Sequence, residues 1–150
     1  MPSYTLVVVD MQSTFAAANR PNVVIAVARE MFRAMKDKAP IILLEYQHCD
    51  PTHRGFLDIL KGHKEKIRLK KPNDDGSAEV VKTLKDKDWP SVKIRVCGVN
   101  TDCCVLATVK GLLKKLPKSK VELVKSACGA AASTRFDWRN YHRHKNLSLV

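Results

Sequence analysis

Residues 92–124 read VKIRVCGVNTDCCVLATVKGLLKKLPKSKVELV and hold the clearest fold signal in the chain. The segment opens with a β-branched run over Val92–Gly98 and closes with another over Val121–Val124, as is typical of strands buried on both faces. Between the two runs, four apolar residues recur at helical spacing: Val105, Val109, Leu112 and Leu116. This order predicts two parallel strands that are joined by a crossover helix.

The same alternation extends over the rest of the chain. Four further apolar runs predict strands: Leu6–Val9, Ile41–Leu44, Ile67–Leu69 and Leu147–Val150. Helical spacing appears over residues 24–35, between Pro21 and Pro40, and in shorter form over 56–60 and 80–84. The pattern predicts an α/β fold: a doubly wound, mostly parallel, Rossmann-like sheet of five or six strands with helices on both faces, in three layers.

Length and composition indicate a single soluble globular domain over residues 1–150. The chain has 150 residues, of which 45% are hydrophobic and 28% are charged. No run approaches the roughly 18 apolar residues of a membrane span, and no basic segment precedes the first apolar run as in a signal peptide. We therefore expect a cytoplasmic protein, in which the five cysteines stay reduced.

The chain is strongly basic, with 27 Lys and Arg against 15 Asp and Glu and a formal charge of +12. Basic and aromatic residues crowd together in residues 138–145, which we call the C-terminal cluster. The lysines are otherwise scattered, and no helix-turn-helix, zinc-finger or RNP pattern occurs. We expect only non-specific, salt-sensitive binding to nucleic acid, and a C-terminal cluster that forms a last surface helix or an oligomer contact.

Ligands of such sheets bind beyond the carboxyl ends of the strands, where the strand order reverses. No Gly-x-Gly-x-x-Gly and no phosphate-binding loop follows any strand, so we expect no nucleotide cofactor. The first strand ends in Asp10, which is costly to bury unless it is paired, lies in a cleft or caps the next turn. The third strand runs into Lys70 and Lys71, and alternation places Lys71 on the inward face with Ile67 and Leu69, although lysines are usually exposed.

The fourth predicted strand leads into the most informative turn, residues 98–105. Thr101 is expected as the N-cap of the next helix, which places Cys104 in its first turn. Free backbone N–H groups and the helix dipole are expected to lower the pKa of that thiol and to favour a nucleophilic thiolate. The alternative is a buried structural cysteine, which is the preferred interpretation for Cys97 and Cys128.

Three segments together resemble the isochorismatase-like cysteine hydrolases, which include nicotinamidases, N-carbamoylsarcosine amidases and ureidoacrylate amidases. Residues 7–15, Val-Val-Val-Asp-Met-Gln-Ser-Thr-Phe, are similar to the family's strand that ends in Asp-x-Gln-x-x-Phe. Residues 71–77, Lys-Pro-Asn-Asp-Asp-Gly-Ser, resemble its lysine segment without the usual Ser-Ala-Phe ending. Residues 98–105, Gly-Val-Asn-Thr-Asp-Cys-Cys-Val, resemble its Gly-Val-x-Thr-x-x-Cys-Val nucleophile turn, the most specific of the three.

The resemblance implies a hydrolase that acts on a small amide, ureido or carbamoyl compound through a thioester acyl-enzyme and needs no cofactor. It implies Cys104 as the nucleophile, Asp10 as the acid and base, and Lys71 as the cation that orients both. It also implies an oxyanion hole formed by the N–H groups of Asn100 and Cys104, with a cis peptide bond between Val99 and Asn100.

Four residues of the resembling segments and of the second strand are candidates for the substrate pocket: Gln12, Phe15, Glu45 and Tyr46. Nicotinamidases bind a metal through Asp-x-His and further histidines, and the matching aspartate is missing here. We therefore interpret His48, Cys49 and His53 as polar surface or pocket residues and expect no metal. The chain is short for the family, which predicts trimmed loops and a homo-oligomer in which a neighbouring subunit completes the site.

Two other functions stay open at this stage. The chain could be a basic module that binds nucleic acid, or a thiol redox protein that uses Cys103 and Cys104. Salt-sensitive binding to an arbitrary duplex would favour the first, and reversible oxidation of both thiols would favour the second.

Overall fold

A computed structural model describes residues 2–132 and 135–150, which contain one six-stranded sheet. Its strands are β1 (Thr5–Val9), β2 (Ile41–Tyr46), β3 (Lys66–Lys71), β4 (Lys93–Val99), β5 (Lys120–Gly129) and β6 (Leu147–Leu149). The helices are α1 (Pro21–Lys36), α2 (Arg54–Ile59), α3 (Ser77–Asp86) and α4 (Cys104–Lys115), with 3-10 turns η1 (Ala16–Asn19), η2 (Leu60–Gly62) and η3 (Trp138–Asn140). The predicted α/β fold is confirmed, and none of the described helices has the length and apolar character that crossing a membrane requires.

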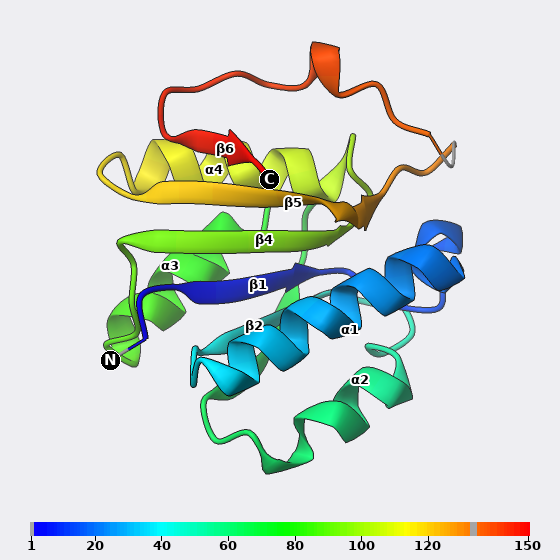
Figure 1. Ribbon diagram of the computed structural model, residues 1–150, viewed down its shortest axis with the longest axis horizontal. Coiled ribbons are helices and arrows are strands. Elements are labelled where there is room, and N and C mark those ends of the chain that lie inside the picture. The colour runs from blue at the N-terminus through cyan, green and yellow to red at the C-terminus, as the bar shows by residue number, and fades with distance from the viewer. Residues whose placement is uncertain (1, 133–134) are drawn as a thin grey trace.

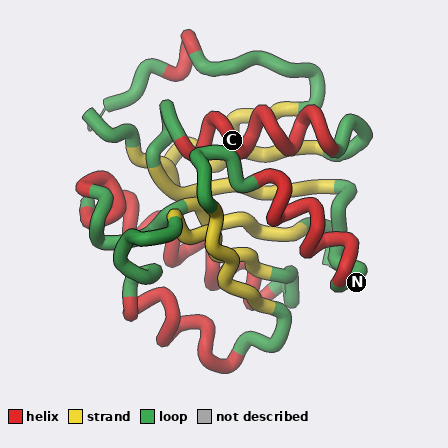
Figure 2. The backbone as a smooth tube through the Cα atoms, turned by 180° about the vertical axis from the view of Figure 1, so that it is seen from behind, coloured by secondary structure: helices red, strands yellow, loops and turns green. Residues whose placement is uncertain are grey.

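Different helices cover the two faces of the sheet (Figure 1). Leu6 and Val8 of β1 belong to the core cluster that includes α1 and α2, whereas Val7 and Val9 belong to the cluster of α3 and α4. Figure 2, turned by 180° from Figure 1, shows the face of the sheet that α3 and α4 cover. Because both faces are buried, the inner strands carry continuous apolar runs, and the three predicted layers are present.

All strand pairs are parallel, and the order β3-β2-β1-β4-β5-β6 reverses between β1 and β4. The carboxyl ends of these two neighbouring strands lead to Asp10 and Asn100. Gly98 allows β4 to approach β1 here, because a Cβ atom at this position would lie 2.1 Å from the Val9 carbonyl oxygen, and its φ is +119°. The reversal is the place where sheets of this type bind ligands.

The start of α4 differs from the sequence prediction. The helix begins at Cys104 with Cys103 as its N-cap residue, so the expected capping role of Thr101 is wrong. The backbone of Thr101 is tied elsewhere: its N–H donates to the Gly129 carbonyl at 2.9 Å, and its carbonyl accepts from the Tyr141 hydroxyl at 3.2 Å. These contacts hold Thr101 in the connection between strand and helix.

β5 is longer than its apolar run predicts. The register between β4 and β5 shifts between Val96 and Gly98, and pairing then resumes at Gly98 with Cys128 and at Val99 with Gly129. The shift lets the polar stretch after Val124 continue the strand to Gly129.

The C-terminal cluster forms only the short 3-10 turn η3 in place of a surface helix, and the alternative of an oligomer contact stays a prediction. Residues 135–146 cross the β5 and β6 edge of the sheet as coil, interrupted by η3 (Figure 1). Phe136, Trp138 and Tyr141 pack against one another with ring centroids 5.0 to 5.9 Å apart. These rings face the core cluster that contains the start of α4, and this inward packing replaces helical periodicity.

Candidate active site

Asp10 and Lys71 form a buried ion pair at the carboxyl edge of the sheet. Lys71 Nζ lies 3.0 Å from Asp10 Oδ2, and the two side chains are 0% and 1% exposed. Asp10 follows β1 directly with a φ of 49°, and Lys71 is the last residue of β3, two strands away. Because buried charges are costly unless they are paired and hydrogen-bonded, each of these groups depends on the other.

The Lys71 ammonium has partners on every side. Besides the ion pair, Nζ donates to the carbonyl oxygens of Asn73 at 3.0 Å and Asp74 at 3.3 Å, and it lies 4.3 Å from the centroid of the Tyr46 ring. These contacts account for the three N–H donors of an ammonium. Lys70 is exposed, so the prediction that Lys71 is the inward lysine is confirmed.

Cys104 lies beside Asp10 and is 4% exposed. Burial raises the pKa of its thiol far above the ordinary value, the Asp10 carboxylate raises it further by charge and hydrogen bonding, and Lys71 opposes the shift. The expectation of a lowered pKa at the helix start is therefore wrong. Desolvation and a neighbouring carboxylate outweigh the helix N-terminus and favour the thiol form of Cys104.

Burial also raises the pKa of Asp10, against the opposing effects of Lys71 and Cys104. A carboxylate with a raised pKa accepts a proton more readily, so it can act as a base toward a neighbouring thiol and then as an acid. Asp10 and Cys104 thus have the mutual placement that proton transfer requires.

The turn after β4 offers unpaired polar groups. The peptide bond between Val99 and Asn100 is cis, as expected. Within the described residues, the N–H groups of Asn100 and Cys104 donate to no acceptor, and the buried Asn100 Oδ1 and Thr101 Oγ1 have no hydrogen-bond partner. Buried polar groups are rarely unpaired in folded proteins, so these atoms are available to a ligand.

Asp74 is a member of the site that sequence reasoning missed. Its carboxylate oxygens lie 3.5 Å from Cys103 Sγ and 3.7 Å from Cys104 Sγ. Thr108 of α4 fixes this loop, because its hydroxyl accepts from the Gly76 N–H at 3.0 Å and donates to the Asp74 carbonyl at 3.4 Å. The available signal was positional: Asp74 follows β3 at the edge where the other site residues end their strands.

The histidines considered for a metal lie in the loop after β2. His48 is exposed, and His53 Nε2 lies 2.9 Å from the carbonyl oxygen of Ala18 in η1. Among the described residues, one group of three side chains places potential metal-ligand atoms within 4.8 Å of one another: Asp74, Cys103 and Cys104.

The four predicted pocket residues have different surroundings. The Tyr46 ring contacts the Lys71 ammonium. The Phe15 ring packs edge to face against the Tyr46 ring, with 6.5 Å between the ring centroids. Gln12 is fully buried and braces the loops, because its amide accepts from the Tyr46 N–H at 2.8 Å and donates to the Tyr46 carbonyl at 3.0 Å. Glu45 is buried and holds Arg68 in an ion pair at 3.0 Å. Gln12, Glu45 and Tyr46 also line a small cavity of about 110 Å³.

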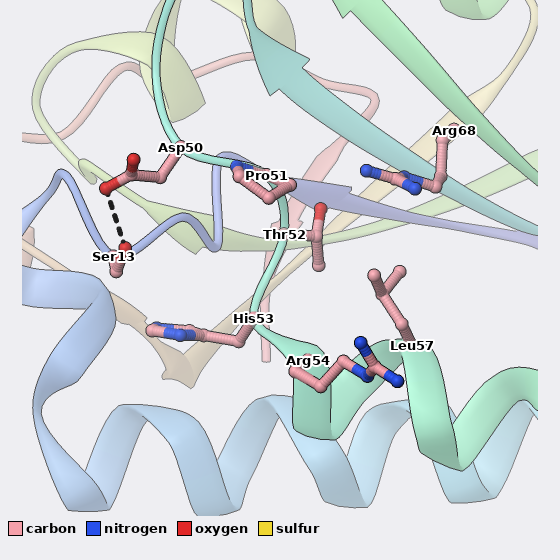
Figure 3. A pocket seen from close by; sticks show the side chains of 8 residues that line it. All are labelled: Ser13, Asp50, Pro51, Thr52, His53, Arg54, Leu57 and Arg68. Carbon is pink, nitrogen blue, oxygen red and sulfur yellow. Dashed lines mark hydrogen bonds between the residues drawn. The ribbon is translucent and has the colours of Figure 1, made fainter.

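A larger cavity of about 510 Å³ lies beside α2 and is called the arginine pocket here (Figure 3). Its lining consists of Ser13, Asp50, Pro51, Thr52, His53, Arg54, Leu57 and Arg68. Both guanidinium groups have acidic partners, Arg54 with Asp58 at 3.5 Å and Arg68 with Glu45 at 3.0 Å. The buried ion pair and Cys104 are not part of this lining.

Several solved structures share the fold. A nicotinamidase from Staphylococcus aureus has 18% sequence identity and a TM-score of 0.73, over 89% of this chain and 88% of that one. The MAR1 ribonuclease from Caenorhabditis elegans has 22% sequence identity and a TM-score of 0.76, over 89% of this chain and 68% of that one. An N-carbamoylsarcosine amidase from Thermoplasma acidophilum has 16% sequence identity and a TM-score of 0.74, over 98% of this chain and 95% of that one.

Sequence comparison gives the family. No curated protein matches the chain. The profile of the Isochorismatase domain matches residues 4–138, which include the whole of the site described above. The chain therefore belongs to the isochorismatase family.

Proposed function

We propose that this protein hydrolyses the C–N bond of a small amide, ureido or carbamoyl compound, with Cys104 as the nucleophile. The observation that carries the proposal is the buried Asp10 and Lys71 ion pair beside the Cys104 thiol. Covalent catalysis by a thiol needs a base within reach and a third group that holds the base in place. The names nicotinamidase and N-carbamoylsarcosine amidase among the structural neighbours support a small amide as the substrate class.

In the first half of the reaction, Asp10 takes the Cys104 proton as the sulfur attacks the carbonyl carbon. The C–N bond then breaks, Asp10 returns the proton to the leaving nitrogen, and a thioester remains on Cys104. The raised pKa of Asp10 suits both transfers, because the group must accept a proton and then release it. Lys71 acts as a positioning residue, since its contacts fix the Asp10 carboxylate.

The unpaired backbone N–H groups of Asn100 and Cys104 supply the oxyanion hole. Donors that are already in place stabilise the negative charge that develops on the carbonyl oxygen. Asn100 Oδ1 and Thr101 Oγ1 are free to accept hydrogen bonds from the N–H groups of the substrate. Water then attacks the thioester with Asp10 as the base, which releases the acid and restores the thiol.

Cleavage of RNA is a second candidate function. The charge of +12 and the likeness to the Caenorhabditis elegans ribonuclease favour it. Asp10 and Asp74 next to Cys104 oppose it, because their carboxylates repel the phosphodiester that would have to reach the sulfur. For this reason the amide class is proposed first.

Release of ammonia from a panel of small amides, ureido compounds and carbamoyl compounds tests the proposal. The wild-type protein is expected to hydrolyse at least one member, Cys104→Ala to be inactive, and Cys103→Ser to stay active as the matched control. Turnover that survives in Cys104→Ala would contradict the proposal. So would a protein that cleaves RNA and no member of the panel.

A further inference from the structure

We propose that Asp74, Cys103 and Cys104 form a binding site for a thiophilic divalent cation such as Zn²⁺ or Cd²⁺, and that a bound ion blocks the nucleophile. The three side chains come from two separate segments, the loop after β3 and the start of α4. Their potential ligand atoms all lie within 4.8 Å of one another. Two sulfur ligands and one carboxylate form a soft donor set, which selects such cations over Mg²⁺ or Ca²⁺.

The distances between sulfur and oxygen atoms in this group are close to those around a tetrahedral ion. With a Zn–S bond of about 2.3 Å and a Zn–O bond of about 2.1 Å, a tetrahedral angle places sulfur and oxygen roughly 3.6 Å apart. Asp74 Oδ2 lies 3.5 Å from Cys103 Sγ and Asp74 Oδ1 lies 3.7 Å from Cys104 Sγ, so each carboxylate oxygen is at this spacing from one of the two sulfur atoms. Three protein ligands leave the fourth position open for water.

The electrostatic surroundings favour a cation although the chain as a whole is basic. Besides burial, the negative charges of Asp74 and Asp102 raise the pKa of the Cys103 thiol, and the negative charge of Asp10 raises the pKa of the Cys104 thiol. The cation next to them, Lys71, is already engaged by Asp10 and two carbonyl groups. A divalent ion that replaces two thiol protons leaves the net charge of the site unchanged, and the neighbouring carboxylates attract the ion.

Access to the site is asymmetric. Asp74 and Cys103 are exposed, whereas Cys104 is 4% exposed. An ion can therefore be captured by the two exposed ligands and then contact the Cys104 sulfur. Binding releases one proton from each thiol to the solvent and occupies the lone pair with which Cys104 would attack a carbonyl carbon. The inhibitory consequence rests on the proposed function, whereas the binding itself does not.

Titration of the reduced protein with Cd²⁺, followed by the ultraviolet charge-transfer absorption of Cd–thiolate bonds, tests binding without any substrate. We expect a band that saturates at one ion per chain and that Zn²⁺ displaces. Cys103→Ser should reduce the band to about half, because one of two thiolate ligands remains. Cys49→Ser is the matched control, since Cys49 lies in the loop after β2, and it should leave the band unchanged.

Asp74→Asn should weaken Cd²⁺ binding at least about tenfold, because even second-shell changes at metal sites have effects of that size. A wild-type protein without the band, an unchanged band in Cys103→Ser, or equal affinity in Asp74→Asn would overturn the proposed ligand set.

The activity assay separates this inference from the proposed function. Zn²⁺ should inhibit the wild-type hydrolase, and Cys103→Ser should require at least about tenfold more Zn²⁺ for half inhibition. A band without any amide hydrolysis would support the metal site and count against the proposed function. Hydrolysis that persists at saturating Zn²⁺ would overturn the blocking of Cys104.

Discussion

Two charged regions lie at the carboxyl edge of the same sheet, and they differ in how far their charged side chains are exposed to solvent. The arginine pocket is the larger, at about 510 Å³, but the side chains of Arg54 and Arg68 are 85% and 47% exposed. In the site around Cys104, the side chains of Asp10 and Lys71 are only 1% and 0% exposed. Water screens the first pair of charges and is excluded from the second.

The larger cavity does not contain the candidate catalytic residues, which are marked instead by burial and by unpaired polar groups. In the arginine pocket, each guanidinium has an acidic partner, and Thr52 Oγ1 is unpaired among the described residues. Around Cys104, the N–H groups of Asn100 and Cys104 and the side-chain oxygens Asn100 Oδ1 and Thr101 Oγ1 have no partner among the described residues. Groups that folding leaves unpaired are available to bind a reacting molecule.

The largest expected contrast between the two regions is catalytic. Asp10→Asn should lower amide hydrolysis about a hundredfold to ten-thousandfold, because an amide cannot take the thiol proton. Arg54→Gln, a change in the arginine pocket, should alter the rate less than about twofold, because its exposed charge is screened. Steady-state ammonia release measures both. Similar losses in the two variants would mean that the arginine pocket takes part in the reaction.

The next contrast concerns stability. Lys71→Ala should reduce the free energy of unfolding by about 3 to 5 kcal/mol, because it leaves the buried Asp10 carboxylate without its partner. Lys70→Ala and Arg54→Ala, at exposed positions, should leave the unfolding curve unchanged within error. Urea unfolding followed by circular dichroism gives these values. Equal shifts from the two lysine changes would show that the ion pair contributes no more than a surface charge.

The thiol chemistry should depend on pH in a defined direction. Because burial and Asp10 raise the pKa of Cys104, its alkylation by iodoacetamide should be slow at neutral pH and should accelerate as the pH rises. Asp10→Asn removes a negative charge, so it should lower this pKa and speed alkylation at pH 7 while hydrolysis is lost. Peptide mass mapping follows the label on Cys104. A variant with the wild-type pH profile would argue against direct contact between the two groups.

The smallest expected effect concerns nucleic acid. The charge of +12 predicts weak binding to any duplex, with an affinity that falls steeply as salt is added. Cys104→Ala should not change it, and Arg54→Gln should change the salt dependence only slightly. Fluorescence anisotropy at several salt concentrations is the measurement. Sub-micromolar, sequence-selective binding at physiological ionic strength would reverse the order of the two candidate functions.

The fold could be predicted because burial on both faces produces continuous apolar runs, as in Leu6–Val9. The end of β5 could not be predicted, because Lys125 and Ser126 are polar and a register shift between β4 and β5 decides the pairing. The role of Thr101 was misjudged for a similar reason, since contacts with residues distant in sequence hold its backbone.

In the candidate site, Asp10 was predictable as the residue that follows β1, and Cys104 as a residue in the first turn of the helix after β4, both within the resembling segments. The direction of the Cys104 pKa shift was not predictable from the sequence, because desolvation and the Asp10 contact arise only when β1 and α4 come together. Asp74 was missed because an exposed acid in a loop has no sequence signal until its distance to the two thiols is known.

Cys104 is proposed to form a thioester with the substrate, and this intermediate can be trapped. The wild-type protein would be mixed with an amide that it hydrolyses, quenched in acid within the first turnovers, and mapped by peptide fragmentation. We predict the acyl mass on Cys104, in the wild type and in Cys103→Ser, and its absence in Cys104→Ala. An acyl group on Cys103, or hydrolysis with no acyl group on either cysteine, would contradict the account.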